Sequence, residues 1–114
     1  MVNDSKMNTD THTKRINQII SQSAIDDFCQ KYHIQKLSLF GSILTADFNK
    51  ESDIDVLVEF DPKYIPGLIS LAKMELELSS ILKRPVDLRT AEDLSKYFRQ
   101  EVLDLALVQY VSKK

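Results

Sequence analysis

"DIDVLVEF", residues 53–60, is the strongest strand pattern in this chain. Its apolar side chains alternate onto both faces of the expected strand, which is typical of a central place in a sheet; they are Ile54, Val56, Leu57 and Val58. Two aspartates, Asp53 and Asp55, nevertheless stand one residue apart at its start. Charged residues in such a strand indicate a functional site at this end of the sheet.

Strand geometry places these two acids together. Side chains at positions i and i+2 point to the same face, so Asp53 and Asp55 lie roughly 6.5–7 Å apart along the strand while Ile54 faces the other way. Like charges about 4 Å apart cost on the order of 4 kcal/mol at an effective dielectric near 20. A divalent cation removes this repulsion, and ligation by carboxylate oxygens alone suits Mg²⁺.

A third acid is available in "RPVDLRT", residues 84–90, which we expect to form another strand. Asp87 stands there between Val86 and Leu88, so its side chain points away from theirs. If this strand neighbours the first, Asp53, Asp55 and Asp87 converge. Such a triad can hold two metal ions, one that lowers the pKa of an attacking hydroxyl and one on the phosphates of a leaving group.

Gly41 and Ser42 follow the short alternating stretch "KLSLF", residues 36–40. A strand that runs into Gly-Ser at the start of a helix directs backbone N–H groups and a hydroxyl outward, and a glycine lets a phosphate come close. We therefore predict an anion-binding turn here. It is not a Walker loop, because the chain has no G-x-x-x-x-G-K-S/T run.

Each of these features also has an ordinary explanation. Asp53 taken alone is as well explained by a strand end, Asp87 alone by a surface strand, and a Gly-Ser turn alone means little. An EF-hand is excluded because the strand continues as apolar residues without a glycine at the sharp turn. The joint pattern is far more specific than its parts.

The rest of the chain alternates helices and strands. Ile16, Ile19 and Ile20 recur at helical spacing, and Ser23 is expected to cap a second helix with Asp26 in its first turn. The apolar face of that helix contains Ile25, Phe28, Cys29 and Tyr32. Residues 61–67, with two prolines and a glycine, predict a loop, and residues 68–82 an amphipathic helix about four turns long.

After the strand at residues 84–90, Thr90 is expected to cap a last helix, with Asp93 in its first turn. Its predicted buried stripe is Leu94, Tyr97, Phe98, Val102 and Leu105. We expect residues 106–111, "ALVQYV", to add a short terminal strand. We therefore predict an α+β fold in which helices pack on a mixed sheet of three to five strands.

Composition limits the classes of protein to consider. The 114 residues, 43% of them hydrophobic, suit one domain, which we place at residues 13–114 after a flexible tail at residues 1–12. Cys29 is the sole cysteine, so we expect a small buried side chain in a reducing, cytoplasmic setting. A net charge of −2 argues against a general nucleic-acid binder, and no apolar run is long enough to span a membrane.

Gly41 and Ser42, ten further residues and then Asp53, Ile54 and Asp55 resemble the GS-x10-D-x-D signature of the nucleotidyltransferase superfamily that includes DNA polymerase beta. More narrowly, residues 15–111 resemble the minimal nucleotidyltransferases, or MNT proteins, of bacteria and archaea. The quoted segments that carry this likeness are "LSLFGSILTADFNKESDIDVLVEF", "ELSSILKRPVDLRT" and "DLSKYFRQEVLDLALVQY".

The resemblance implies a nucleotidyltransferase core with Gly41 and Ser42 on the triphosphate of ATP and with Mg²⁺ on Asp53, Asp55 and Asp87. It also implies a partner, because MNT proteins commonly act as antitoxins that transfer AMP from ATP to a tyrosine of a HEPN-domain ribonuclease toxin.

One residue departs from the family pattern. Many relatives carry arginine three residues after the serine, where this chain has Thr45, and Lys73, Lys83 or Arg84 are candidates to replace that cation. Thr45 leaves open a non-catalytic antitoxin that neutralises its toxin by binding. A transferase acting on a small molecule or RNA, as in other relatives, is a further alternative.

Overall fold

The computed structural model describes residues 16–113. The tail expected at residues 1–12 lies outside this range, and so do residues 13–15 at the start of the expected domain.

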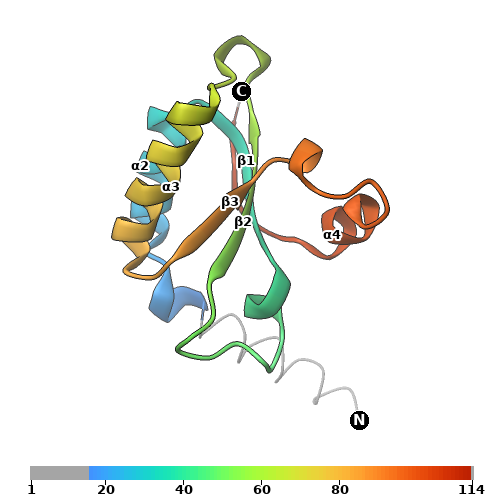
Figure 1. Ribbon diagram of the computed structural model, residues 1–114. Coiled ribbons are helices and arrows are strands. Elements are labelled where there is room, and N and C mark those ends of the chain that lie inside the picture. Colours follow the sequence, from blue (N-terminus) through green and yellow to red (C-terminus); the bar gives the residue numbers. More distant parts are fainter. Residues whose placement is uncertain (1–15, 114) are drawn as a thin grey trace.

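A four-stranded mixed sheet forms the centre of the molecule (Figure 1). Its strands are β1 (Ile34–Phe40), β2 (Ile54–Phe60), β3 (Val86–Arg89) and β4 (Leu107–Val111), in the spatial order β3-β2-β1-β4. β1 runs antiparallel to both β2 and β4, whereas β2 and β3 are parallel. The central position predicted for residues 53–60 is confirmed, and so are the mixed sheet and the terminal strand.

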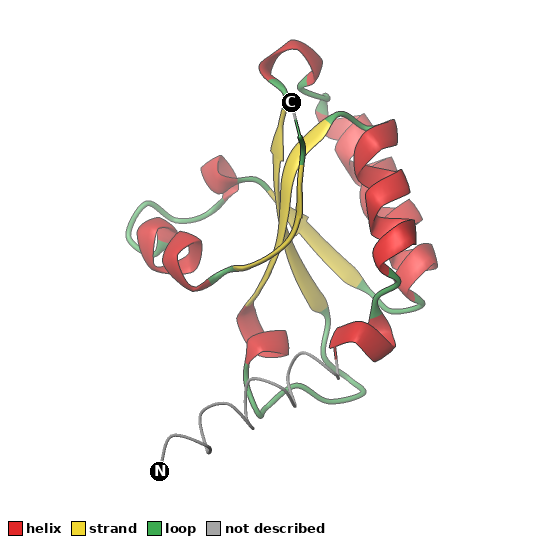
Figure 2. Cartoon of the chain, turned by 180° about the vertical axis from the view of Figure 1, so that it is seen from behind, coloured by secondary structure: helices red, strands yellow, loops and turns green. Residues whose placement is uncertain are grey.

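Two helices cover one face of this sheet, and the other face is largely open. α2 (Gln22–Lys31) and α3 (Leu68–Leu82) lie side by side on the covered face, while α4 (Arg99–Leu105) stands off on the opposite side (Figures 1 and 2). The core lies between the sheet and the two helices, where β2 contributes Ile54, Val56 and Val58. Leu57, on the opposite face, is also buried, at 3% exposed.

The predicted helix at residues 68–82 is confirmed, with the bounds of α3 as expected. It buries Met74, Leu78 and Leu82, and Leu71 and Ile81 pack against the core. The first helical pattern also holds, since residues 16–19 are helical and Ile16 and Ile20 are buried.

The predicted cap of the second helix is wrong by two residues. Ser21, not Ser23, is the N-cap of α2, because its side-chain oxygen accepts the backbone N–H of Ala24 at 3.4 Å. The buried face is as expected, with Ile25, Phe28 and Cys29 in the core. Burial raises the pKa of the Cys29 thiol to about 12, with the charge of Asp26 adding to it, which suits the expected structural role of this side chain.

The last helical segment differs most from its prediction. Thr90 and Asp93 do form a capping box, but it closes a short 3-10 turn, Ala91–Asp93, and α4 begins only at Arg99. The predicted buried stripe is wrong: Tyr97 is 82% exposed, Phe98 61% and Leu105 66%. The segment lies on the side of the sheet opposite α2 and α3 (Figure 2), and these three apolar side chains face solvent there.

Among residues 16–113, none of the helices has the length and apolar character needed to cross a lipid bilayer.

Candidate active site

Asp55 and Asp87 stand side by side on the open face of the sheet. β2 and β3 pair in parallel with Asp55 opposite Asp87, and Ile54 on β2 opposite Val86. Because Ile54 is fully buried against the helices, strand alternation turns Asp55 to the open face, and directly paired residues share a face. The convergence of these two acids from separate strands is therefore as the sequence predicted.

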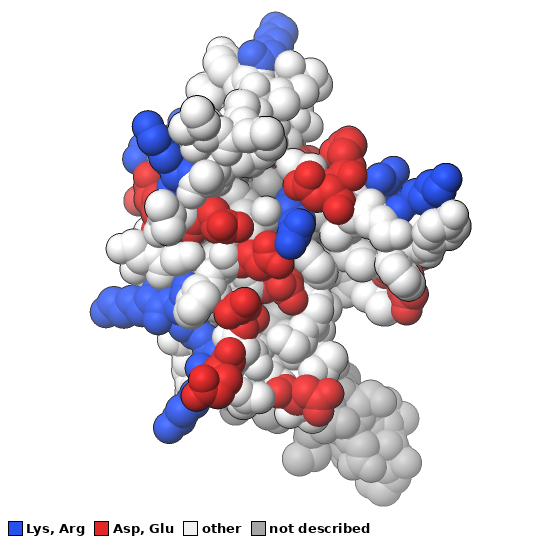
Figure 3. Space-filling view, in the orientation of Figure 1, with Lys and Arg blue, Asp and Glu red and all other residues white. Residues whose placement is uncertain are grey.

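Asp53 directly precedes β2 and is exposed. Burial is the largest cause that raises the pKa of Asp55, followed by the negative charges of Asp87 and then Asp53, while Arg89 opposes the shift. The three predicted acids thus interact electrostatically around Asp55. Figure 3 shows acidic side chains gathered in a band across this side of the molecule.

Gly41 faces the carboxylate of Asp55 directly. Phe40, the last residue of β1, pairs with Asp55, and Gly41 follows with φ of +75°. A Cβ atom at Gly41 would overlap Asp55 Oδ2 and stand 3.1 Å from Asp55 Cγ. We expected this glycine to make room for a phosphate, but the structure shows that it first makes room for Asp55.

Ser42 lies in the 3-10 turn Gly41–Leu44 that follows β1. Its carbonyl oxygen accepts the backbone N–H of Thr45 at 2.9 Å and the Thr45 hydroxyl at 2.8 Å. Thr45 Oγ1 in turn accepts the N–H of Asp47 at 3.2 Å. The Thr45 hydroxyl therefore stabilises the turn through these two hydrogen bonds, and an arginine at this position has no hydroxyl to form them.

The cations considered as replacements for that arginine lie elsewhere. Arg84 donates from Nη2 to the carbonyls of Asn49, at 2.6 Å, and Ser52, at 2.7 Å, and its guanidinium stacks 4.4 Å from the Phe48 ring centroid. These contacts fix the loop that leads into Asp53. Lys73 lies on α3, on the covered side of the sheet, and Lys83 caps the C-terminus of α3 in a left-handed conformation.

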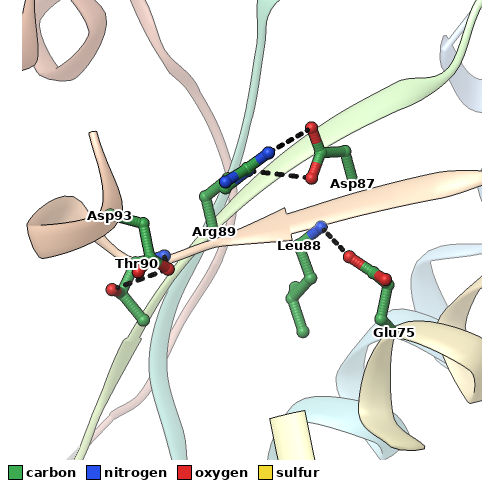
Figure 4. A network of polar contacts seen from close by, with 6 residues as sticks. All are labelled: Glu75, Asp87, Leu88, Arg89, Thr90 and Asp93. Atoms are coloured by element: carbon green, nitrogen blue, oxygen red, sulfur yellow. Dashed lines mark hydrogen bonds and ion pairs between the residues drawn. The ribbon is translucent and has the colours of Figure 1, made fainter. Parts of the chain in front are cut away.

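Arg89 is the site residue that sequence reasoning missed. Its Nε donates to Asp87 Oδ1 at 2.9 Å and its Nη2 to Oδ2 at 3.3 Å (Figure 4). The i, i+2 spacing of Asp87 and Arg89 in a strand was the available signal, since it places both side chains on one face.

Two side chains of α3 fix the outer edge of β3. Glu75 Oε2 accepts the N–H of Leu88 at 2.8 Å (Figure 4), and Ser79 Oγ accepts the N–H of Val86 at 3.0 Å. These bonds satisfy donors that an edge strand would otherwise leave unpaired. They also hold Asp87, which lies between the two bonded residues, in register with Asp55.

The donor set of Asp53, Asp55 and Asp87 consists of carboxylate oxygens, the ligands that Mg²⁺ prefers, and their mutual repulsion at Asp55 is the electrostatic condition that a cation relieves. In this respect the residues fit a magnesium site. However, within residues 16–113 no three His, Cys, Asp or Glu side chains are already arranged as a metal-binding group. Instead, the Asp87 carboxylate forms an ion pair with Arg89.

A cavity of about 640 Å³ lies away from these acids, and its lining includes Cys29 of α2, Tyr110 of β4 and His33, which lies between α2 and β1. None of the predicted site residues lines it. The candidate active site is an open surface.

A mixed sheet with paired aspartates beside a glycine-serine turn defines a nucleotidyltransferase core. Residues 21–108 match the family model described as Nucleotidyltransferase domain, and the chain therefore belongs to this family. Protein adenylyltransferase MntA of Thermococcus cleftensis is 28% identical over 74 residues, which are 65% of this chain and 73% of that relative.

Solved structures share the fold. A crystal structure of a toxin-antitoxin with AMP-PNP has a TM-score of 0.68 at 22% identity and covers 82% of this chain and 76% of its own. The structure of a tri-AMPylated Shewanella oneidensis HEPN toxin in complex with MNT antitoxin has a TM-score of 0.60 at 22% identity and covers 81% of this chain and 71% of its own.

Proposed function

We propose that this chain is an antitoxin that transfers AMP from ATP to a tyrosine of a HEPN-type ribonuclease toxin in the cytoplasm. The observation that carries the proposal is the pairing of Asp55 with Asp87 directly beside the Gly41–Ser42 turn. The family assignment supports the nucleotide transfer. The relatives named for protein adenylyltransfer, and for a toxin modified with AMP, support the acceptor.

In this proposal the residues have distinct parts. The backbone N–H groups at Gly41 and Ser42 bind the triphosphate, and Asp53, Asp55 and Asp87 hold Mg²⁺. Bound there, Mg²⁺ supplies charge neutralisation on the phosphates and lowers the pKa of the attacking hydroxyl. The tyrosine hydroxyl gives its proton to solvent water and its oxygen bonds to the α-phosphorus. The bond from that phosphorus to the bridging oxygen breaks, and pyrophosphate leaves with that oxygen.

An exposed apolar surface supports a protein acceptor. Tyr97, Phe98 and Leu105 are all more than 60% exposed, and they belong to the segment that stands on the same side of the sheet as the acids (Figures 1 and 2). Exposed aromatic residues that gather in this way mark protein interfaces. The acidic band of Figure 3 disfavours RNA as the acceptor, because it repels a phosphate backbone.

The test is transfer of label. The chain, a HEPN-type partner, Mg²⁺ and ATP labelled at the α-phosphate should give a labelled partner, and ATP labelled at the γ-phosphate should not. The double variant Asp53→Asn, Asp55→Asn should abolish the signal. Transfer that persists in this variant would eliminate the proposed site.

A second candidate is neutralisation by binding alone. Thr45, in place of a phosphate-binding arginine, favours it, as does the guanidinium of Arg89 on Asp87. The double asparagine variant separates the two functions: if it still protects cells from the toxin when expressed at the wild-type level, binding suffices. Loss of protection with toxin binding intact supports catalysis.

A further inference from the structure

Arg89 interacts with two acids of the site, Asp87 by hydrogen bonds and Asp55 through its charge. It is bound to both carboxylate oxygens of Asp87, and the two side chains are 47% and 37% exposed. The hydrogen bonds that Arg89 donates to Asp87 are the main reason why the pKa of Arg89 is raised, and the charges of Asp87, Asp93 and Glu75 raise it further. Arg89 stays positively charged at any physiological pH, so it acts as a fixed cation.

The positive charge of Arg89 beside Asp87 opposes the binding of a second cation to this carboxylate. A divalent ion that binds Asp87 must approach oxygens that already accept N–H donors, and it must approach a guanidinium of like charge. Two cations within a few ångströms repel strongly in a partly buried site. Arg89 and a metal ion therefore compete for the same carboxylate.

A second anionic position lies close to Arg89. Asp93, in the turn that follows β3, accepts the N–H and the hydroxyl of Thr90 at 3.0 and 3.2 Å, and both bonds use Oδ2 (Figure 4). Its Oδ1 is not used in these bonds. Figure 4 places Arg89 between Asp87 on one side and the Thr90–Asp93 turn on the other.

We propose that Arg89 is a positioning residue that holds Asp87 as its counter-ion and moves to Asp93 when a divalent cation takes Asp87. The transfer keeps the guanidinium paired in both arrangements, so the site exchanges one cation for another on the same carboxylate. Before the cation binds, Arg89 also compensates part of the negative charge of Asp53, Asp55 and Asp87. The inference rests on the proposed role of Asp87 as a metal ligand.

The experiment is a titration of the full chain with MnCl₂ in the absence of nucleotide, followed by calorimetry and by the spin signal of unbound Mn²⁺. Arg89→Gln should bind Mn²⁺ about tenfold more tightly than the wild type, because a competing charge at close range is gone. Arg89→Lys keeps the charge and should stay near the wild type. Asp93→Asn keeps an acceptor for Thr90 but removes the second anionic position, so it should bind Mn²⁺ more weakly.

Matched controls separate the explanations. Lys73→Gln removes a positive charge from the covered side of the sheet and should leave the Mn²⁺ affinity unchanged, which excludes a general charge effect. In the double variant Arg89→Gln, Asp87→Asn the gain in affinity should vanish. A purely structural role of Arg89 predicts weaker, not tighter, binding in Arg89→Gln.

Two outcomes are distinguishable. If Arg89→Gln binds Mn²⁺ no more tightly than the wild type while Asp87→Asn binds it far more weakly, the counter-ion inference is overturned and the proposed metal site stands. If Asp87→Asn binds Mn²⁺ as the wild type does, Asp87 is not a ligand, and both the inference and that part of the proposed function fail.

Discussion

Gly41→Ala tests most directly how the site is built. The chain has only two glycines, and Gly41 has a positive φ with the carboxylate of Asp55 where a side chain would be. A left-handed conformation costs an alanine roughly 1–2 kcal/mol. Forcing the Asp55 side chain off its rotamer adds about 0.5–1.5 kcal/mol. The free energy of unfolding should therefore fall by about 1.5–3.5 kcal/mol.

Thermal unfolding measures this loss. For a domain of this size each 1 kcal/mol lowers Tm by about 4–8 °C, so we expect a decrease on the order of 10 °C. Nucleotide transfer should fall about 100-fold, because displacement of Asp55 by about 1 Å misplaces the reacting groups. Gly67→Ala is the matched control: a Cβ there meets nothing within 4 Å, so its stability should change by less than about 1 kcal/mol and its activity should remain.

A double-mutant cycle isolates the contact itself. In an Asp55→Ala background the carboxylate is absent, so Gly41→Ala should cost only the backbone conformation, about 1 kcal/mol less than in the wild type. An equal cost in the two backgrounds would refute the reasoning that Gly41 makes room for Asp55.

Three further predictions concern the acids, the edge strand and the exposed aromatics. Because the pKa of Asp55 is raised in the folded state, ionisation of Asp55 destabilises the wild type as pH rises above the unfolded pKa of about 4. Asp55→Asn removes this ionisation, so in the presence of EDTA it should raise Tm at pH 7. Near pH 3.5 the gain in Tm should disappear. Glu75→Ala leaves the partly buried Leu88 N–H without its acceptor, which should cost about 1 kcal/mol and speed hydrogen exchange of that amide. Tyr97→Ala with Phe98→Ala should leave Tm within a few degrees but weaken capture of the toxin at least tenfold.

Each of these has its own control. A gain for Asp55→Asn that is as large at pH 3.5 as at pH 7 contradicts the titration argument. Leu76→Ala, on the outer side of the same helix and 72% exposed, should not reproduce the loss seen for Glu75→Ala. Ile65→Ala with Leu68→Ala removes an equally exposed apolar pair away from α4, and toxin capture that falls equally in both pairs would place the interface elsewhere.

Local patterns were sufficient for much of the fold. The strand predicted at residues 53–60 from its apolar run is β2, and the helix predicted at residues 68–82 from its helical period is α3. Capping chemistry was correct at Thr90 and Asp93, yet the turn it closes is not the start of α4. A cap marks where a helical turn can begin, but the contacts beyond that turn decide how far it continues.

The error at Tyr97 and Phe98 has a related cause. Helical spacing predicts which side chains share a face, but burial of that face needs a second layer to pack against. Within residues 16–113, α2 and α3 both lie on the other side of the sheet, so the segment with Tyr97 and Phe98 has no long helix to pack against. Nothing in the spacing of residues 94–105 distinguishes a stripe that meets a core from one that meets solvent.

The sequence by itself placed Gly41, Ser42, Asp53 and Asp55 in one continuous stretch, and strand period alone predicts that Asp53 and Asp55 share a face. Only the tertiary structure decided that β3 lies parallel to β2 with Asp87 opposite Asp55, and that Arg89 stands on Asp87. Strand register and ion pairing depend on contacts between segments distant along the chain, which α3 brings together through Glu75 and Ser79. Local periodicity contains no information about such contacts.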